Sequence, residues 1–476
     1  RSHDESMRII VFNVFCPLFH DVEKRMAGND IKSLVRRLPA DFVWGTATSA
    51  YQVEGAAFAD GKGASIWDDF VRLPGKVKNG DTGDVACDHY HRYREDVALL
   101  AELGVGAYRF SLSWSRLLPD GAGAVNRKGV DFYKRLLGEL REKNITPYVT
   151  LYHWDLPSAL QAKGGWSDRA VLDWFEEYAG VVLEHLGADI PNFIILNEPA
   201  VIAYVGHYEG IHAPGLKSAA AMYATMHHLN MAHGRSCRQI KAAFPEAQVA
   251  STYTHFPIYP LDEKPENAAA AQLMMSVWSD GFFGPAFKGA YPANIRDFVA
   301  PYVREGDMET CRASGDFLGI NHYCPDYAVA VDEDIPARLT FAHNAGKIDP
   351  TGTTDLGWPI VPQGLYDALV DLKERYNPKR IIITEGGGAF NDAPDAGGKI
   401  HDRRRIDYYA AYLQAALRAR RDGVPLEGYF AWSFLDNFEW GEGYGPRFGL
   451  VHVDYDGGLK RTPKDSFYWF RDLTGR

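Results

Sequence analysis

Two glutamates follow short apolar runs at distant points of the chain. Glu198 follows "NFIIL" after one asparagine, Asn197, and Glu385 follows "IIIT" within "IIITEGGG". A carboxylate beside a buried strand is unfavourable unless it is paired or used. Two acids that face one pocket support three main chemistries: glycosidic cleavage, metal-assisted hydrolysis, and proton abstraction stabilised by a metal.

The two metal-dependent chemistries need further ligands. The histidine pairs around His89 ("DHYHRYRED") and His227 ("HHLNMAH") lie in segments with a helical pattern, where histidines more often cap or pack. His153 is the only imidazole that we expect at a strand end. We therefore predict that the protein has no metal site.

Glycosidic cleavage needs one carboxyl that stays protonated and one that stays ionised. Glu198 precedes Pro199 and follows an apolar strand, so partial desolvation is expected to raise its pKa and to suit it as the acid. Arg109 is a candidate cation that keeps Glu385 charged. We expect the three glycines after Glu385 to leave room for a substrate.

From Asp41 onward, apolar β-rich runs alternate with amphipathic helical segments, which is typical of a parallel α/β fold. Eight runs read as strands, at residues 42–49, 107–114, 147–154, 193–198, 247–256, 317–323, 380–386 and 428–434. Eight repeats without a glycine-rich phosphate loop favour a closed (β/α)₈ barrel over an open sheet. In such a barrel the polar residues at the carboxyl ends of the strands meet on one face.

Composition excludes several classes of function. The 476 residues are 46% hydrophobic and 24% charged, which indicates a globular protein. The net charge is −11 and the basic residues are scattered, so we predict no binding to nucleic acid. Five widely spaced cysteines without a C-x-x-C pair favour a reducing, cytoplasmic setting.

The N-terminal segment differs from the rest of the chain. The run "MRIIVFNVFCPLF" is too short to span a bilayer and lacks a small-x-small cleavage site after it. We predict that residues 1–38 are an extension outside the barrel and that the protein does not bind a membrane. Secretion is the alternative to a cytoplasmic location.

Six motifs in a fixed order resemble family 1 glycoside hydrolases, the β-glucosidase family. They are "FVWGTATSAYQVEGA", "YRFSLSWSR", "YHWDLP", "NEP", "ITEGG" and "WSFLDNFEWGEGYGPRFGLVHVDY". The resemblance implies a single (β/α)₈ TIM barrel over residues 39–476, without metal or organic cofactor. It implies retaining hydrolysis of terminal β-D-glucosyl residues of small glucosides or oligosaccharides, with β-galactosides and β-fucosides left open.

The resemblance also implies roles for individual residues. Glu198 matches the acid/base and Glu385 the nucleophile, while Arg109 and Tyr323 match the pair that contacts the nucleophile. The positions that match substrate-binding residues are Gln52, His153, Trp154, Asn197, Asn321, Tyr323, Trp358, Trp432, Glu439, Trp440 and Phe448.

Two positions depart from the family pattern. Gly386 stands where the family usually has asparagine, which leaves the tuning of Glu385 open, and His322 is expected to alter the outer pocket. Glu439 argues for an unphosphorylated sugar, because a carboxylate would repel a phosphate.

Two other functions remain as alternatives: a catalytically weak sugar-binding relative, and a transglycosylating β-glycosidase that uses the same site. A role in cellulose degradation is an expectation from the family. The sequence gives no oligomeric state.

Overall fold

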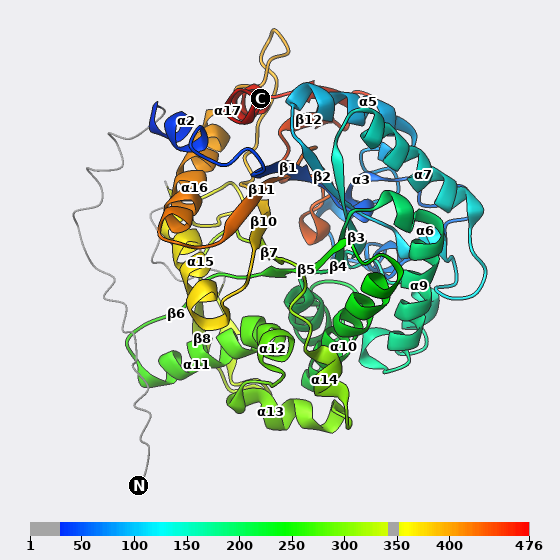
Figure 1. The fold of residues 1–476 in the computed structure, drawn as a ribbon, viewed down its shortest axis with the longest axis vertical. Helices are drawn as coiled ribbons and strands as arrows, with labels where there is room; N and C mark the ends of the chain where they lie inside the picture. Colours follow the sequence, from blue (N-terminus) through cyan, green and yellow to red (C-terminus); the bar gives the residue numbers. More distant parts are fainter. Residues whose placement is uncertain (1–28, 341–351, 476) are drawn as a thin grey trace.

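Eight parallel strands close into a barrel at the centre of the molecule (Figure 1). A computed structural model describes residues 29–340 and 352–475. The barrel strands are β1 (Val43–Ala47), β2 (Ala107–Ser111), β3 (Thr146–Tyr152), β4 (Asn192–Asn197), β5 (Gln248–Thr254), β7 (Leu318–Asn321), β10 (Ile381–Gly386) and β11 (Leu426–Trp432). Each hydrogen-bonds its neighbours in the ring order β1-β11-β10-β7-β5-β4-β3-β2. The prediction of a closed (β/α)₈ barrel is therefore confirmed, and all eight predicted runs overlap a barrel strand.

Apolar side chains from successive strands fill one end of the barrel. Tyr148 of β3 and Phe430 of β11 meet with ring centroids 4.9 Å apart. The full cluster is Ala107, Tyr148, Ile194, Ala250, Phe317, Ile382 and Phe430. Because the strands are buried on both faces, their sequences read as continuous apolar runs, as in other parallel sheets. The plugged end leaves the opposite, carboxyl end of the strands for polar side chains.

Helices surround the strands as an outer layer (Figure 1). The longer ones are α5 (His89–Leu103), α7 (Arg127–Glu142), α9 (Val171–Leu186), α10 (Ala219–Ala243), α11 (Pro265–Met275), α15 (Pro362–Tyr376), α16 (Arg403–Arg421) and α17 (Asp465–Thr474). The shorter ones are α3 (Ala50–Val53), α4 (Ile66–Phe70), α6 (Trp114–Leu117), α8 (Ser158–Gln161), α12 (Gly281–Phe283), α13 (Ala293–Val299) and α14 (Asp307–Cys311). Gly104 ends α5 in the left-handed conformation, which costs little at a residue without a Cβ atom.

Two small sheets lie outside the barrel. One is the hairpin of β12 (Val451–Asp454) and β13 (Lys460–Pro463), and the other joins β6 (Ile258–Pro260), β8 (Asp326–Ala330) and β9 (Ala337–Leu339). The hairpin follows the long loop after β11, so it lies next in the chain to the predicted site.

A short helix precedes the barrel. Helix α2 (Asn29–Val35) contacts α16 and α17, and its Ile31 side chain is fully buried. Most of the predicted extension, residues 1–28, lies outside the described residues. The boundary at residue 38 therefore stays a prediction, although the part of the extension that is described packs against the outer helices.

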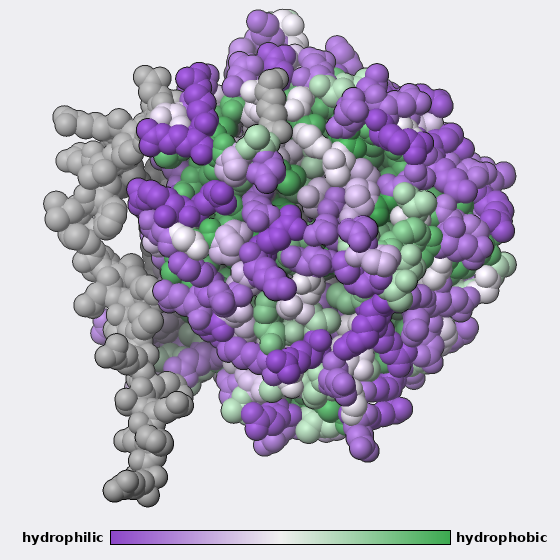
Figure 2. Space-filling model, in the orientation of Figure 1, coloured by the Kyte–Doolittle hydropathy of each residue, from purple (hydrophilic) through white to green (hydrophobic). Residues whose placement is uncertain are grey.

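Hydrophilic residues cover most of the face shown in Figure 2, with apolar residues between them. Within residues 29–340 and 352–475, no helix is both long and apolar enough to cross a membrane.

Candidate active site

The ring closure brings together polar side chains that are far apart in the sequence. Asn197 is the last residue of β4, Asn321 is the last residue of β7, and Glu385 is the second-last residue of β10. Arg109 projects from β2 and hydrogen-bonds both Glu385 and Asn197. A single connected cluster thus joins residues from four strands at the carboxyl end of the barrel.

Glu385 is held by two donors. Arg109 Nη1 donates to its Oε1 at 2.6 Å, and the Tyr323 hydroxyl donates to its Oε2 at 2.7 Å. Thr150 in turn accepts a bond from Arg109 Nε at 3.2 Å, which fixes the guanidinium. Burial raises the pKa of Glu385, and Arg109 and Tyr323 oppose that rise by stabilising its ionised form.

Glu198 has a different environment. Its Oε1 accepts a hydrogen bond from Asn321 Nδ2 at 2.6 Å, whereas Arg109 is paired with Glu385. Burial, followed by the charge of Glu385, raises the pKa of Glu198 to about 8. Burial thus raises the pKa of Glu198, as expected from the apolar run before it, and favours its protonated form.

The backbone at Glu198 is strained. Its φ is 48°, in the left-handed region that costs a residue with a Cβ atom about 1–3 kcal/mol. Trp154 and Trp440 have positive φ values as well, of 79° and 48°. Three predicted site residues therefore have a conformation that the surrounding structure must enforce.

Asn197 connects the arginine to a histidine. Its Oδ1 accepts from Arg109 Nη2 at 2.6 Å, so its Nδ2 faces His153 Nε2 at 3.1 Å. Burial and the nearby Arg109 lower the pKa of His153, which is therefore neutral with its hydrogen on Nδ1. The Trp154 indole also donates to the Asn197 carbonyl, at 3.0 Å.

Aromatic rings line this cluster. The His153 ring stacks on Trp432, at 6.1 Å and 19°, and on Trp440, at 6.0 Å and 17°. Trp432 also packs in one apolar cluster with Phe448, against which Tyr323 and Trp358 lie. The Tyr323 ring centroid is 5.4 Å from that of Trp358 and 6.1 Å from that of Phe448. Flat apolar faces next to polar groups are suited to the faces of a sugar ring.

The loop after β11 carries the remaining predicted residues. Gln52 Nε2 donates to the Phe438 carbonyl at 2.8 Å, which connects the segment after β1 to the loop after β11. Glu439 is half-buried, and its Oε2 is shielded from solvent and has no hydrogen-bond partner among the described residues. Burial, then the charges of Glu385 and Glu198, raises the pKa of Glu439 to about 8. An acceptor of this kind can bind hydroxyl groups of a ligand.

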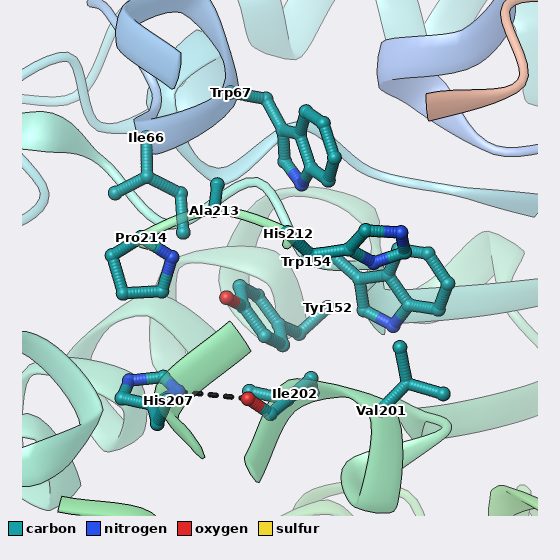
Figure 3. Close-up of a pocket in the computed structure, with 10 residues that line it drawn as sticks. All are labelled: Ile66, Trp67, Tyr152, Trp154, Val201, Ile202, His207, His212, Ala213 and Pro214. Carbon is teal, nitrogen blue, oxygen red and sulfur yellow. Dashed lines mark hydrogen bonds between the residues drawn. The ribbon is translucent and has the colours of Figure 1, made fainter. Parts of the chain in front are cut away.

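An apolar pocket lies beside the cluster (Figure 3). Val201 and Ile202 form one wall of the pocket; they begin the π-helix Val201–Glu209, which starts three residues after Glu198. Trp67, Trp154 and His212 form another wall. The other lining residues are Ile66, Tyr152, His207, Ala213 and Pro214. The Trp154 ring separates this pocket from Asn197, to whose carbonyl its indole donates.

The other histidines named from the sequence lie elsewhere. His89 is bonded to Asp96 within α5, and His227 of α10 is bonded to Tyr291 and Asp307. Within the part of the chain that the structure describes, no group of three or more His, Cys, Asp or Glu side chains could hold a metal ion. His89 therefore links two residues of α5, and His227 links α10 to α14.

The expectation that the glycines after Glu385 leave room for a substrate is wrong. A Cβ atom on Gly386 would lie 2.7 Å from the Tyr429 hydroxyl, and one on Gly387 would lie 1.8 Å from the Trp432 carbonyl oxygen. The space is filled by the protein itself. Gly386 therefore allows β10 to approach Tyr429, a packing reason for its departure from the family pattern.

His322 also lies in a different place from that expected. Its Nδ1 donates to the His255 carbonyl at 2.9 Å, and its ring packs 6.2 Å from Tyr412 of the outer helix α16. Burial lowers its pKa to about 4. The side chain is thus a neutral packing group between strand and helix, and not part of the outer pocket.

Sequence reasoning missed the threonines that support the cluster. Thr384 and Thr252 connect to Asn321, and Thr150 supports Arg109. Alternation along a strand would send Thr384 and Glu385 to opposite faces. The pairing of β10 with β7 shifts register between Ile383 and Glu385, and this bulge lets both side chains reach the cluster.

Known proteins of one family match this chain over the whole barrel. The model of Glycosyl hydrolase family 1 matches residues 34–476. The chain is 46% identical to 1,4-beta-D-glucan glucohydrolase of Thermotoga neapolitana over 92% of this chain and 98% of that protein. It has the same identity and coverage with Beta-glucosidase A of Thermotoga maritima.

Solved structures give the same picture. The family 1 β-glucosidase of Thermotoga maritima superposes with a TM-score of 0.86 at 44% identity, covering 92% of this chain and 98% of that one. A complex of the Thermotoga maritima β-glucosidase with glucoimidazole also gives a TM-score of 0.86, at 45% identity over 91% of this chain and 98% of the other.

Proposed function

Because the chain belongs to glycosyl hydrolase family 1, we propose that it is a retaining β-glucosidase that removes terminal β-D-glucosyl residues. The observation that carries this proposal is the division of roles between the two buried carboxyls. Arg109 and Tyr323 stabilise the ionised form of Glu385, whereas burial and the charge of Glu385 favour the protonated form of Glu198. Retaining hydrolysis needs this combination of nucleophile and acid.

In the first step, Glu385 attacks the anomeric carbon and the bond to the leaving oxygen breaks. Glu198 gives its proton to that oxygen, so the aglycone leaves as an alcohol. The product is a glycosyl ester on Glu385. Arg109 and Tyr323 position the attacking carboxylate, since each of its oxygens accepts one of their hydrogen bonds.

In the second step, water attacks the glycosyl ester. Esterification removes the negative charge of Glu385, and with it the repulsion that raised the pKa of Glu198. Glu198, now ionised, accepts a proton from the water and Glu385 leaves as a carboxylate. The sugar is released with its original anomeric configuration, and both carboxyls return to their starting state.

The buried polar groups around the pair are suited to a glucose unit. Glu439 offers an unshared carboxylate oxygen, His153 offers an N–H at Nδ1, and Gln52 is anchored at the loop that carries Glu439. Trp432 provides a flat surface for the ring. We infer an unphosphorylated glycone, because a sugar phosphate would meet the acidic side chain of Glu439.

Turnover of an aryl β-D-glucoside by the purified protein tests the proposal, with aryl β-galactoside, aryl β-fucoside and cellobiose as comparison substrates. Glu385→Gly should abolish hydrolysis, and added formate should restore formation of a glycosyl formate. An unimpaired Glu385→Gly enzyme would overturn the assignment of the nucleophile. No turnover of any substrate by the wild type would favour a sugar-binding relative.

Two finer points belong to the proposal. Cellobiose released from cellulose is a candidate natural substrate, and its turnover in the panel above tests that role.

The described cysteines are all free thiols that form no disulfide bond, which supports a reducing, cytoplasmic compartment. They are Cys87, Cys237, Cys311 and Cys324. Cell fractionation of the source organism tests that location, and an extracellular fraction would contradict it.

A further inference from the structure

A chain of hydrogen bonds leads from two threonines to the acid/base carboxyl. Thr252 Oγ1 of β5 donates to Thr384 Oγ1 of β10 at 3.0 Å, and Thr384 Oγ1 donates to Asn321 Oδ1 of β7 at 2.9 Å. Asn321 Nδ2 then donates to Glu198 Oε1 at 2.6 Å. Both threonines and the asparagine are completely buried.

These bonds fix the direction of the Asn321 amide. Thr384 donates its hydrogen to Asn321 Oδ1 and accepts from Thr252. The amide nitrogen faces Glu198 and the Asn197 oxygen, which lies 3.1 Å away and already accepts from Arg109, so only an N–H can satisfy it. The reversed amide would place its oxygen against the Asn197 oxygen and lose that hydrogen bond, together with the donation to the ionised form of Glu198.

We propose that Thr384, backed by Thr252, is a positioning residue that holds the Asn321 amide as a donor to Glu198 and so sets the proton affinity of the acid/base. This inference rests on the proposed function, which gives Glu198 that role. The hydroxyl bonds of the two threonines lead to Asn321 and to neither catalytic carboxyl, so each hydroxyl acts through Asn321.

The hydrogen bond from the Asn321 amide lowers the pKa of Glu198, whereas burial and the charge of Glu385 raise it. Burial and the charge of Glu385 favour the protonated form, and the charge of Arg109 favours the ionised form. Glu439 also belongs to the cluster, and its own pKa is raised to about 8 by burial and by the charges of Glu385 and Glu198. Tyr323 and His153, the remaining titratable groups of the cluster, are neutral. Asn321 is the one direct donor to this carboxyl among the described residues. A stable donor lets the same carboxyl release its proton in the first step and remain ionised for the second.

Thr384→Val is the direct test, since valine keeps the shape of threonine and removes the hydroxyl. Without it the amide loses its anchor, the ionised form of Glu198 loses its donor, and protonation becomes more favourable. The alkaline limb of kcat/KM for an aryl β-D-glucoside should move to higher pH, by about one unit. An unchanged limb would overturn the inference.

Matched variants separate the hydroxyl from the packing. Thr384→Ser keeps the donor and loses only a methyl group, so its alkaline limb should coincide with that of the wild type. Thr46→Val removes a buried hydroxyl that donates to the Ala431 carbonyl on another part of the barrel. It should lower stability without moving the limb. A shift in either control would indicate a general packing effect and contradict the relay.

The order of the relay gives a second test. In an Asn321→Ala background, Thr384→Val should cause no further shift, because the amide that it orients is absent. Thr252→Val should shift the limb in the same direction by a smaller amount, since Thr384 still donates to Asn321. If Thr384→Val does not fold, Thr252→Val carries the test, and an unshifted limb there overturns the relay.

Failure of the proposed function would be recognised separately. The carboxyl carbon resonance of Glu198, assigned by comparison with Glu198→Gln, reports its titration without any turnover. An inactive wild type would overturn the proposed function, whereas the resonance would still show whether Thr384→Val raises the titration midpoint. An active wild type with an unmoved midpoint in Thr384→Val would overturn the relay alone.

Discussion

Glu198 and Glu385 carry the same functional group, and their neighbours make them chemically different. Glu385 accepts from an arginine and a tyrosine, whereas Glu198 accepts from one amide and lies near the charge of its partner. The difference depends on a few hydrogen bonds of 2.6 to 2.7 Å. At the scale of single residues, catalysis therefore depends on which donors are supplied to each oxygen.

Removing the charge of Glu385 should lower the pKa of Glu198. In Glu385→Gln the repulsion is absent, as it is in the glycosyl ester, so Glu198 should titrate below the value of about 8 that it has in the intact pair. The carboxyl resonances of Glu198 in the two proteins measure this directly. An equal or higher midpoint in Glu385→Gln would contradict the coupling between the two carboxyls.

The pH profile of the wild type follows from the same pair. Activity should fall as pH rises through the raised pKa of Glu198, which then loses the proton that it must donate. Activity should also fall at acidic pH as Glu385 becomes protonated. The measurement is kcat/KM against pH, and an alkaline limb that persists in Glu198→Gln would show that another group controls it.

Strand ends, rather than single residues, determine where these side chains meet. Register shifts interrupt the pairing of β10 with both of its neighbours and the pairing of β4 with β5. The bulges turn consecutive residues toward one cluster, which regular alternation along a strand would not allow. Glycines after Glu385 then let β10 approach β11 closely.

Gly387→Ala should disrupt this approach. The added Cβ atom would lie 1.8 Å from the Trp432 carbonyl oxygen, so the ends of β10 and β11 must separate. We expect a loss of about 2 kcal/mol in the free energy of unfolding, together with reduced kcat. Urea unfolding and aryl glucoside kinetics measure the two effects.

Gly138→Ala is the matched control for Gly387→Ala. Gly138 lies within α7, and a Cβ atom there would have no atom within 4 Å. Alanine should stabilise that helix by about 0.5–1 kcal/mol without any change in activity. A Gly387→Ala protein as stable as Gly138→Ala would contradict the close approach of the two strands.

At the scale of the whole molecule, a buried network of charges joins distant segments beneath the site. Lys464 Nζ donates to Asp436 at 2.9 Å and to Asp392 at 3.1 Å, and Arg447 also donates to Asp436, at 2.8 Å. Arg405 of α16 contacts Asp392 as well. The loops after β10 and β11 are thereby tied to the last hairpin and to an outer helix.

Lys464→Met should be strongly destabilising. The side chain is completely buried, and its loss would leave Asp436 and Asp392 with too little positive charge. Breaking a buried pair from one side typically costs about 3–5 kcal/mol, whereas Lys128→Met, at an exposed pair with Asp60, should cost less than about 1 kcal/mol. Equal midpoints of the two variants in urea would refute the role of the network.

The barrel could be predicted from the sequence, and so could the two carboxyls that the structure brings into one cluster, because both have short-range signals. Apolar runs mark the strands; Glu198 follows one such run after Asn197, and Glu385 follows another after Thr384. Thr384 and His322 could not be placed in the same way. The first depends on a bulge and the second on a contact with α16, and neither is visible in the periodicity of one strand.

The left-handed backbone at Glu198 implies a trade between function and stability. Glu198 has a strained backbone and a buried ionisable side chain, and both lower the free energy of unfolding of the protein. Glu198→Gly should relieve the strain, whereas Glu198→Ala should retain it, so the glycine variant should be more stable than the alanine variant by about 1 kcal/mol. Thermal melts of the two inactive proteins measure that difference. Natural selection for stability alone would thus favour the loss of this carboxylate, and its presence records selection for the reaction.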